Sequence, residues 1–157
     1  MLPEDQPEPE VVDVEAATTA VISGVVPMSD VAPFFDRAFS TLPAVLAEQG
    51  IAPLGAAFAL YHSPPGETLD LSVGFPTDRT VATEGEVHAS RLPAGRVARV
   101  VHHGSFDQLG SSWERLRRWI DERGLTAGGV LWEVYVTEPD PQMDPGELRT
   151  QLNWLLT

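Results

Sequence analysis

The sequence predicts one α+β domain made of two copies of a β-α-β-β unit, related by a pseudo-twofold axis, with two main helices and an antiparallel sheet. Segments rich in Val, Ile and Thr are separated by two segments whose apolar residues have helical spacing. This order of segments occurs twice along the chain. The length of 157 residues also suits a single domain.

The first unit begins with residues 11–26, whose β-branched composition predicts one or two strands interrupted near 23–24. A helix follows, because Ser29 or Asp30 can cap its start and apolar side chains then recur at helical spacing. We expect Gly50 to end this helix, since glycine is favoured just after a helix C-terminus.

The rest of the first unit consists of the end of the helix, which contains a proline, and two strands. Pro43 lies inside the expected helix, and because a proline there removes a backbone donor, we expect a kink or a split. Residues 56–62 and 69–75 have strand composition and are joined by the turn-forming residues 63–66. These two strands complete one β-α-β-β unit.

A connector leads to the second unit, in which the same pattern of elements returns. The expected elements are a connector 77–95 with a short strand at 87–91, a strand 96–102, a helix from 104–105 to Gly124, and strands 130–137 and 148–156. The last two strands are separated by the turn-rich residues 138–141.

The two units align with each other in sequence. Adding 74 to the residue number aligns Phe58 with Trp132 and Tyr61 with Tyr135. The last strand of each unit aligns with a shift of 81, which implies that the final hairpin is seven residues longer in the second unit. One copy alone would leave a sheet edge and an apolar helix stripe uncovered, and a second copy buries both. The expected limits are a mobile, disordered acidic tail 1–10 and a domain 11–157, with repeat one at about 17–76 and repeat two at about 93–157.

Composition excludes several kinds of partner. The net charge of −13 opposes binding to nucleic acid, because Lys and Arg supply most of the affinity for phosphates. No apolar run approaches the roughly 18 residues of a membrane helix, and the first ten residues lack the basic charge of a targeting sequence. Cysteine is absent, which excludes disulfides and fits a cytoplasmic location.

Standard catalytic and cofactor motifs are missing from the sequence. His62, His88 and the pair 102–103 have no metal-ligand spacing, so we expect no metal. There is no nucleophile elbow, phosphate-binding glycine loop or dinucleotide fingerprint, so we expect no cofactor. Nothing in the sequence groups the serines and histidines into a catalytic triad.

Glu133 is the residue most indicative of a site. It lies in the most hydrophobic stretch of the second half, within the expected strand 130–137. Side chains alternate along a strand, so Glu133 and Tyr135 should point the same way. A carboxylate among apolar residues is costly unless it is hydrogen-bonded, paired or protonated. The alternative is an edge-strand acid that faces water or is paired with an arginine such as Arg99.

Aromatic side chains are expected around Glu133. A tyrosine next to a carboxylate can hold it by a hydrogen bond or present its ring to a cation. Aromatic residues at helical spacing more often belong to the core, but those of both halves would converge on the face of Glu133. The proposed ligand-binding residues are Glu133, Tyr135, Tyr61, Trp113, Phe35, Phe39, Phe75 and Leu109.

Six pieces of the sequence form a recognisable ordered set: Tyr61, 70–76 (DLSVGFP), 92–98 (LPAGRVA), 103–106 (HGSF), 132–135 (WEVY) and 147–152 (ELRTQL). Together they resemble the GyrI-like small-molecule-binding family, which has a SOUL-like fold. This family includes the effector-binding domains of bacterial multidrug-responsive transcription activators. The resemblance extends from about residue 11 to residue 156, nearly the whole chain.

The resemblance implies a ligand cleft between the two halves. In that cleft the acid matching Glu133 would meet cationic, aromatic or amphipathic small molecules, and Tyr135 matches the tyrosine that follows this acid in the family. Gln151 stands where many relatives have an acid, and 153–156 departs from the usual ending, so the far wall of the cleft should differ. Because no helix-turn-helix domain precedes the pattern, we expect a stand-alone domain for multidrug or effector binding or sequestration.

The resemblance leaves two other functions open. Some relatives are hydrolases that open the strained cyclopropane of electrophilic natural products with the same acid, and in that case Glu133 and Tyr135 would be catalytic. The gyrase-inhibitor relatives imply a protein-interaction module instead. The sequence does not define the natural ligand or the oligomeric state.

Overall fold

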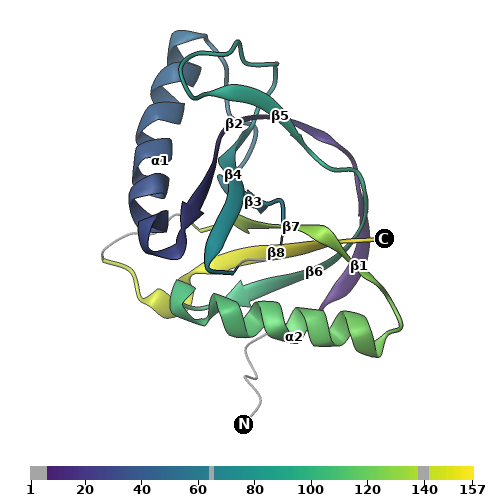
Figure 1. Ribbon diagram of the computed structural model, residues 1–157. Helices are drawn as coiled ribbons and strands as arrows, with labels where there is room; N and C mark the ends of the chain where they lie inside the picture. Colours follow the sequence, from purple (N-terminus) through teal and green to yellow (C-terminus); the bar gives the residue numbers. More distant parts are fainter. Residues whose placement is uncertain (1–6, 64–65, 138–141) are drawn as a thin grey trace.

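The computed structural model describes residues 7–63, 66–137 and 142–157. They form a strongly curled sheet with two helices on its outer side (Figure 1). The strands are β1 (Glu10–Val14), β2 (Ala17–Pro27), β3 (Phe58–Tyr61), β4 (Thr68–Pro76), β5 (His88–Leu92), β6 (Gly95–His103), β7 (Ala127–Tyr135) and β8 (Arg149–Leu156). The helices are α1 (Val31–Glu48), α2 (Leu109–Glu122) and the short 3-10 turns η1 (Met28–Asp30), η2 (Phe106–Gln108) and η3 (Pro145–Glu147). The predicted α+β class, with two main helices on an antiparallel sheet, is confirmed.

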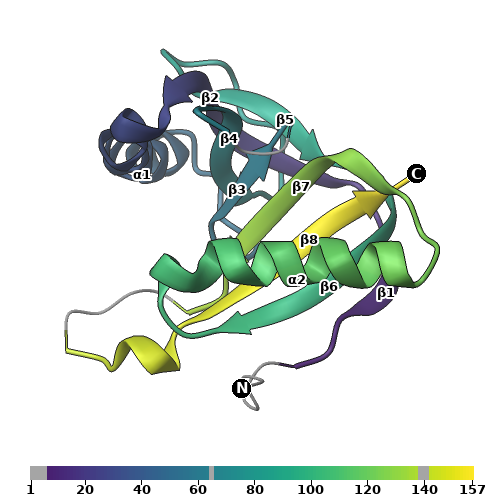
Figure 2. The same cartoon turned by 60° about the horizontal axis from the view of Figure 1, so that its bottom comes forward.

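The eight strands form one antiparallel sheet in the order β1-β6-β8-β7-β3-β4-β2-β5. The two edge strands are β1 and β5. The chain runs from β1 directly into β2, near the opposite edge of the sheet, and from β5 directly into β6, near the other edge. These two crossings close the sheet into a half-barrel. Figure 2 shows α2 lying across β6 and β8, while α1 packs beside β2 and β4.

The order of elements is the same in the two halves, β2-α1-β3-β4 and β6-α2-β7-β8. The halves meet at the central pair β3–β7, where Ala59 lies opposite Glu133. A twofold axis through that pair would exchange the contact of Phe58 with Val134 and the contact of Leu60 with Trp132, and the register contains both. An internal duplication of the sequence stays a prediction.

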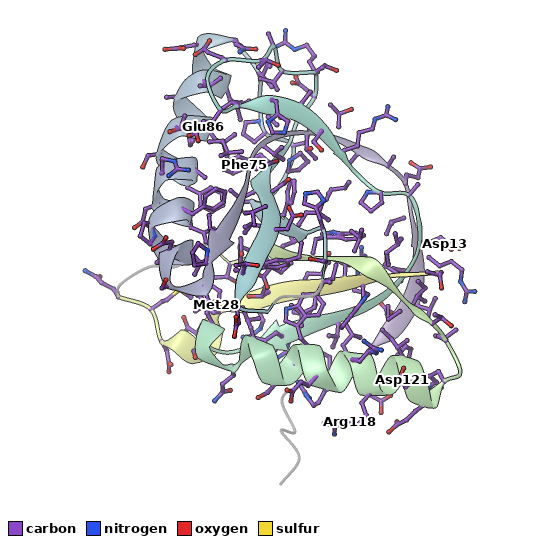
Figure 3. The ribbon with its side chains drawn as sticks, in the orientation of Figure 1. Asp13, Met28, Phe75, Glu86, Arg118 and Asp121 are labelled. Atoms are coloured by element: carbon purple, nitrogen blue, oxygen red, sulfur yellow. The ribbon has the colours of Figure 1, made fainter. Side chains whose placement is uncertain are left out.

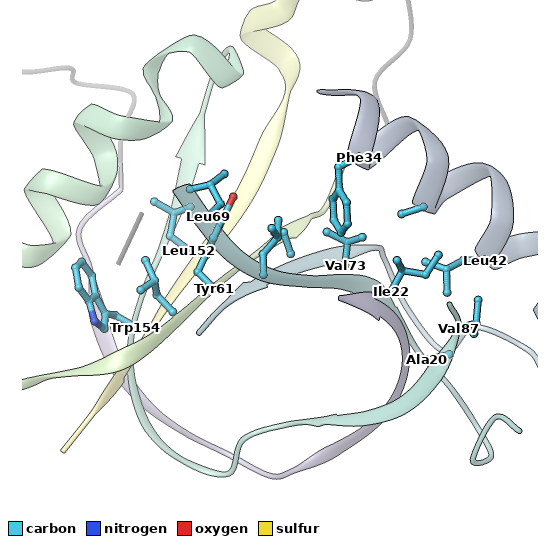
Figure 4. Packing of buried hydrophobic residues seen from close by; sticks show 14 of the residues in the cluster. Ala20, Ile22, Phe34, Leu42, Tyr61, Leu69, Val73, Val87, Leu152 and Trp154 are labelled. Carbon is cyan, nitrogen blue, oxygen red and sulfur yellow. The ribbon is translucent and has the colours of Figure 1, made fainter. Parts of the chain in front are cut away.

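Apolar side chains fill both sides of the sheet. The helix-side core packs α1 and α2 onto the outer face, and Figure 4 shows it extending from Trp154 and Leu152 below α2 to Phe34 and Leu42 below α1. The smaller inner core fills the half-barrel and consists of Val21, Phe58, Leu60, Val97 and Trp132. This division follows from strand alternation, which sends odd and even residues of each strand to opposite faces.

The first strands differ from the prediction. The break lies at 15–16 and not at 23–24, because Gly24 stays paired with Leu71 inside β2. Gly24 serves close packing, since a Cβ at this position would lie 2.9 Å from the Phe34 ring. Strand β1 starts at Glu10, the last residue of the predicted tail, while 1–6 and the predicted turn residues 64–65 and 138–141 lie outside the described residues.

Helix α1 also differs from the prediction, since Pro43 neither splits nor ends it. Pro43 is exposed, so the carbonyl left without a donor lies on the solvent side of the helix. Leu42, Val45 and Leu46 meanwhile anchor the same turn in the helix-side core. Asp30 occupies the N-cap position but makes no side-chain capping bond. None of the helices in the described part of the chain is long and apolar enough to cross a membrane.

Candidate functional site

Glu133 lies at the centre of the sheet, on the helix side, with 5% of its surface exposed. Its Oε1 accepts hydrogen bonds from the Tyr61 hydroxyl at 2.9 Å and from the Tyr135 hydroxyl at 2.7 Å. Its Oε2 accepts a longer bond, 3.4 Å, from Trp113 Nε1. The carboxyl group is therefore held by three neutral donors from β3, β7 and α2.

Strand register explains this convergence. Tyr135 follows Glu133 by two residues on β7 and so faces the same side. Tyr61 lies opposite Leu131, two residues before Glu133, so its long side chain reaches the acid diagonally across the β3–β7 pair. Trp113 reaches down from α2, which packs against β7. The three donors thus come from both halves of the domain.

No ion pair involving Glu133 is found within the described ranges, in which the carboxylate has only the neutral partners named above. Arg99, the arginine considered as its partner, instead donates to Asn153 Oδ1 at 2.7 Å. Asn153 lies opposite Trp132 and belongs to the inner side of the sheet. Both alternatives for Glu133, an exposed edge acid and an arginine-paired acid, are therefore wrong.

Burial dominates the electrostatics of this group. Loss of hydration raises the pKa of Glu133 above its ordinary value, and the bonds from Tyr135, Tyr61 and Trp113 offset only part of this rise. Burial and the nearby carboxylate also raise the pKa of both tyrosines, so their hydroxyls stay protonated as donors. The site thus presents an acid whose neutral form persists to higher pH than that of an exposed glutamate.

The raised pKa of Glu133 predicts a pH-dependent difference in stability. A group whose pKa is higher in the folded state stabilises the protein below its unfolded pKa, and this contribution is lost as pH rises through the folded value. We expect Glu133→Gln, which cannot ionise, to gain free energy of unfolding relative to the wild type as pH rises above 4.5, the unperturbed pKa. Urea denaturation between about pH 4 and pH 8 measures this difference, and a pH-independent difference would contradict the raised pKa.

A row of aromatic rings leads from the acid towards α1. Tyr135 meets Phe35 edge-on with ring centres 6.4 Å apart, and Phe35 stacks on Phe39 at 5.8 Å. Phe39 then meets Phe75 of β4 at 5.9 Å. Figure 3 shows Phe75 near α1, and Arg118 and Asp121 on the other helix, α2. These contacts bring together three of the predicted site residues, Phe35, Phe39 and Phe75.

Two aromatic residues of this region were not among the predicted site residues. Phe106 packs edge-on against Tyr135 at 5.9 Å and is 40% exposed, and Trp154 packs against Trp113 at 5.7 Å. Alternation along β8 could have placed Trp154, because Leu152 lies opposite Glu133 and Trp154 therefore shares its face. Leu109 packs on the helix-side core at the start of α2.

A surface hollow of about 580 Å³ lies between α2 and the sheet. It is lined by Gly110, Trp113, Glu114, Arg117, Arg118, Asp121, Leu131 and Trp154. Glu133 itself does not line the hollow, and Trp113 is the residue that both lines it and donates to the carboxyl group. Within the part of the chain that the structure describes, no group of three or more His, Cys, Asp or Glu side chains could hold a metal.

The chain is thus an α+β domain with a curled antiparallel sheet, two helices on its outer side and a buried carboxyl group beneath them. The model of the GyrI-like small molecule binding domain matches residues 7–155. The chain therefore belongs to the GyrI-like small-molecule-binding family. No curated protein matches the sequence at a significant level.

Solved structures with the same fold are distant in sequence. The C-terminal domain of EcmrR superposes with a TM-score of 0.80 at 17% identity, over 96% of this chain and 97% of that one. In the EcmrR–DNA complex the TM-score is 0.78 at 18% identity, over 95% of this chain and 57% of the EcmrR chain. SAV2435 bound to tetraphenylphosphonium gives a TM-score of 0.71 at 13% identity, over 96% of this chain and 94% of that one. These identities establish the fold alone.

Proposed function

We propose that the domain binds lipophilic, aromatic cations, with Glu133 as the charge partner. One observation carries the proposal: the buried carboxyl group has three neutral donors and no cationic partner among the described residues. A buried carboxylate without a counter-ion is costly, and a bound cation would remove that cost. The net charge of −13 further favours cations over anions near the surface.

The surrounding side chains fit the same class of ligand. Tyr135, Phe35 and Phe39 present aromatic faces and edges within one row, and such rings attract a cation by roughly 0.5 to 2 kcal/mol each. Glu133 Oε2 has only the 3.4 Å contact from Trp113 and so retains capacity for a closer partner. Movement of the Trp113 indole would connect the acid with the hollow.

Proteins with a similar structure support this proposal. SAV2435, which shares the fold, is bound to tetraphenylphosphonium, a lipophilic aromatic cation. EcmrR, in turn, is known in a complex with DNA. The proposal assigns no nucleic-acid contact to the domain described here, whose sequence contains no lysine and has a net charge of −13.

Hydrolysis of an electrophilic small molecule is a second candidate function. The observation that favours it is the pair of tyrosine hydroxyls at 2.9 and 2.7 Å from one carboxyl oxygen, since an acid of raised pKa can donate or accept a proton there. A hydrolase from Listeria innocua shares the fold with a TM-score of 0.70 at 15% identity, over 96% of this chain and 92% of that one. Product formation during binding measurements distinguishes the two functions.

Tryptophan fluorescence tests the proposed function. Trp113 contacts Glu133, whereas Trp132 lies in the inner core, so Trp113 should report on occupancy. We expect saturable quenching by tetraphenylphosphonium and at least about 30-fold weaker binding of tetraphenylborate, which has the same shape and the opposite charge.

The control for this titration is the double variant Trp113→Phe/Trp154→Phe, because Trp154 also lines the hollow and contacts Trp113. In this variant the quenching should largely disappear while calorimetry still detects the cation. Equal affinity for the cation and the anion would overturn the charge-partner role. Turnover of the ligand, detected by mass spectrometry, would favour the hydrolase instead.

A further inference from the structure

Four polar side chains form a hydrogen-bonded chain on the inner side of the sheet, opposite to Glu133. His62 Nε2 lies 2.9 Å from Ser72 Oγ, Ser72 Oγ lies 2.7 Å from Ser23 Oγ, and Ser23 Oγ lies 3.3 Å from His88 Nε2. The residue pattern did not group these serines and histidines, because the four lie on separate segments of the chain. The sheet order β3-β4-β2-β5 brings these four residues side by side.

The protons in this chain have a defined direction. His88 Nδ1 lies 3.2 Å from the backbone carbonyl of Glu86, which can only accept, so Nδ1 carries the hydrogen. In the neutral imidazole His88 Nε2 is then an acceptor, and the Ser23 hydroxyl donates to it. The Ser23 oxygen in turn accepts from Ser72, whose own oxygen accepts from His62 Nε2. Each of the three hydrogen bonds between these side chains thus has one donor hydrogen and one acceptor.

This arrangement has the parts of an activated nucleophile: a hydroxyl, a base that accepts its proton, and a third group that orients the base. Ser23 is the hydroxyl, His88 the base and the Glu86 carbonyl the orienting group. We propose that Ser23 is a nucleophilic serine that accepts the acyl group of small uncharged esters. Ser72 is a positioning residue that donates to the Ser23 oxygen and is itself buried, at 2% exposure.

Ser23 is accessible for this reaction. Strand β5 pairs with β2 only as far as Val21, so Ser23 lies just beyond the end of β5 and is exposed. Val25, two residues further on the same side, is 67% exposed and offers an apolar surface for an acyl chain. Asp70 lies opposite Val25 and is exposed, so anionic esters should be disfavoured.

The proposed reaction is transfer of an acyl group from an ester to Ser23, followed by hydrolysis of the acylated serine. Ser23 Oγ forms a bond to the ester carbonyl carbon while its proton passes to His88 Nε2. The bond between that carbon and the alcohol oxygen breaks, and His88 returns the proton to the departing oxygen. The products are an acylated Ser23 and a free alcohol, and attack by water on the acyl group then regenerates Ser23 and releases the carboxylic acid.

Covalent labelling of the full chain tests this inference. We expect a fluorophosphonate probe to add once to the wild type, at Ser23, as located by intact-mass and peptide mass spectrometry. Ser23→Ala should lose the adduct, and His88→Gln should slow labelling at least about 10-fold because the base is missing. Ser29→Ala removes another exposed serine and is the matched control, which should be labelled like the wild type.

A second measurement uses p-nitrophenyl acetate, which should give a burst of p-nitrophenol that depends on Ser23 and His88. Circular dichroism confirms that each variant is folded, and peptide mapping of the wild type decides the site independently of any variant. An adduct at another residue, no adduct at all, or a folded His88→Gln protein labelled at the wild-type rate would overturn the inference.

Discussion

Replacing Glu133 with glutamine is expected to weaken binding of tetraphenylphosphonium at least about 30-fold, or about 2 kcal/mol. Glutamine has nearly the same shape and can still accept from Tyr61 and Tyr135, so the row of aromatic rings should remain in place. Only the negative charge is lost, and in a site with little water a charge contributes more to binding than at the surface. Isothermal titration calorimetry measures the change.

Two matched ligands and the pH dependence separate charge from packing. Binding of neutral triphenylphosphine oxide should change less than about threefold in Glu133→Gln, since this ligand does not depend on the charge. Wild-type affinity for the cation should rise with pH as Glu133 loses its proton, whereas the affinity of Glu133→Gln should stay level. Equal loss for the cation and the neutral ligand would discard the charge-partner role.

Gly74→Ala is expected to lower the free energy of unfolding by at least about 4 kcal/mol or to prevent folding. A Cβ at Gly74 would lie 1.9 Å from the backbone oxygen of Ala20 and 2.9 Å from the Cα of Val21. These atoms belong to β2, which pairs with β4 along its length, so neither strand can move without breaking the sheet. Chemical denaturation measures the loss.

Gly129→Ala provides the control, because nothing lies within 4 Å of a Cβ at that position of β7. Its stability should stay within about 1 kcal/mol of the wild type. A similar loss in both variants would show that general strand propensity, and not the contact between β2 and β4, decides the effect at Gly74.

Much of the fold followed from residue pattern. The helical spacing around Phe34 and Leu42, and around Leu116 and Ile120, predicted α1 and α2, and the apolar faces of both helices are buried as expected. The sequence also predicted a short strand near residue 88, which is β5. Pattern was misleading where burial outweighed local propensity, as with Gly24 inside β2 and Pro43 inside α1.

For the candidate site, the sequence by itself determined that Glu133 and Tyr135 share one face of an apolar strand, because alternation along a strand is a local property. Only the tertiary structure decided that Tyr61 and Trp113 complete the donors of Glu133, and that Arg99 turns to Asn153 on the other side. The order of strands in the sheet fixes these contacts, and it depends on long-range pairing that no single segment encodes. Long-range strand pairing also explains why the sequence did not reveal the serine–histidine chain. Its bonded residues Ser23 and His88, for example, are 65 positions apart in the sequence.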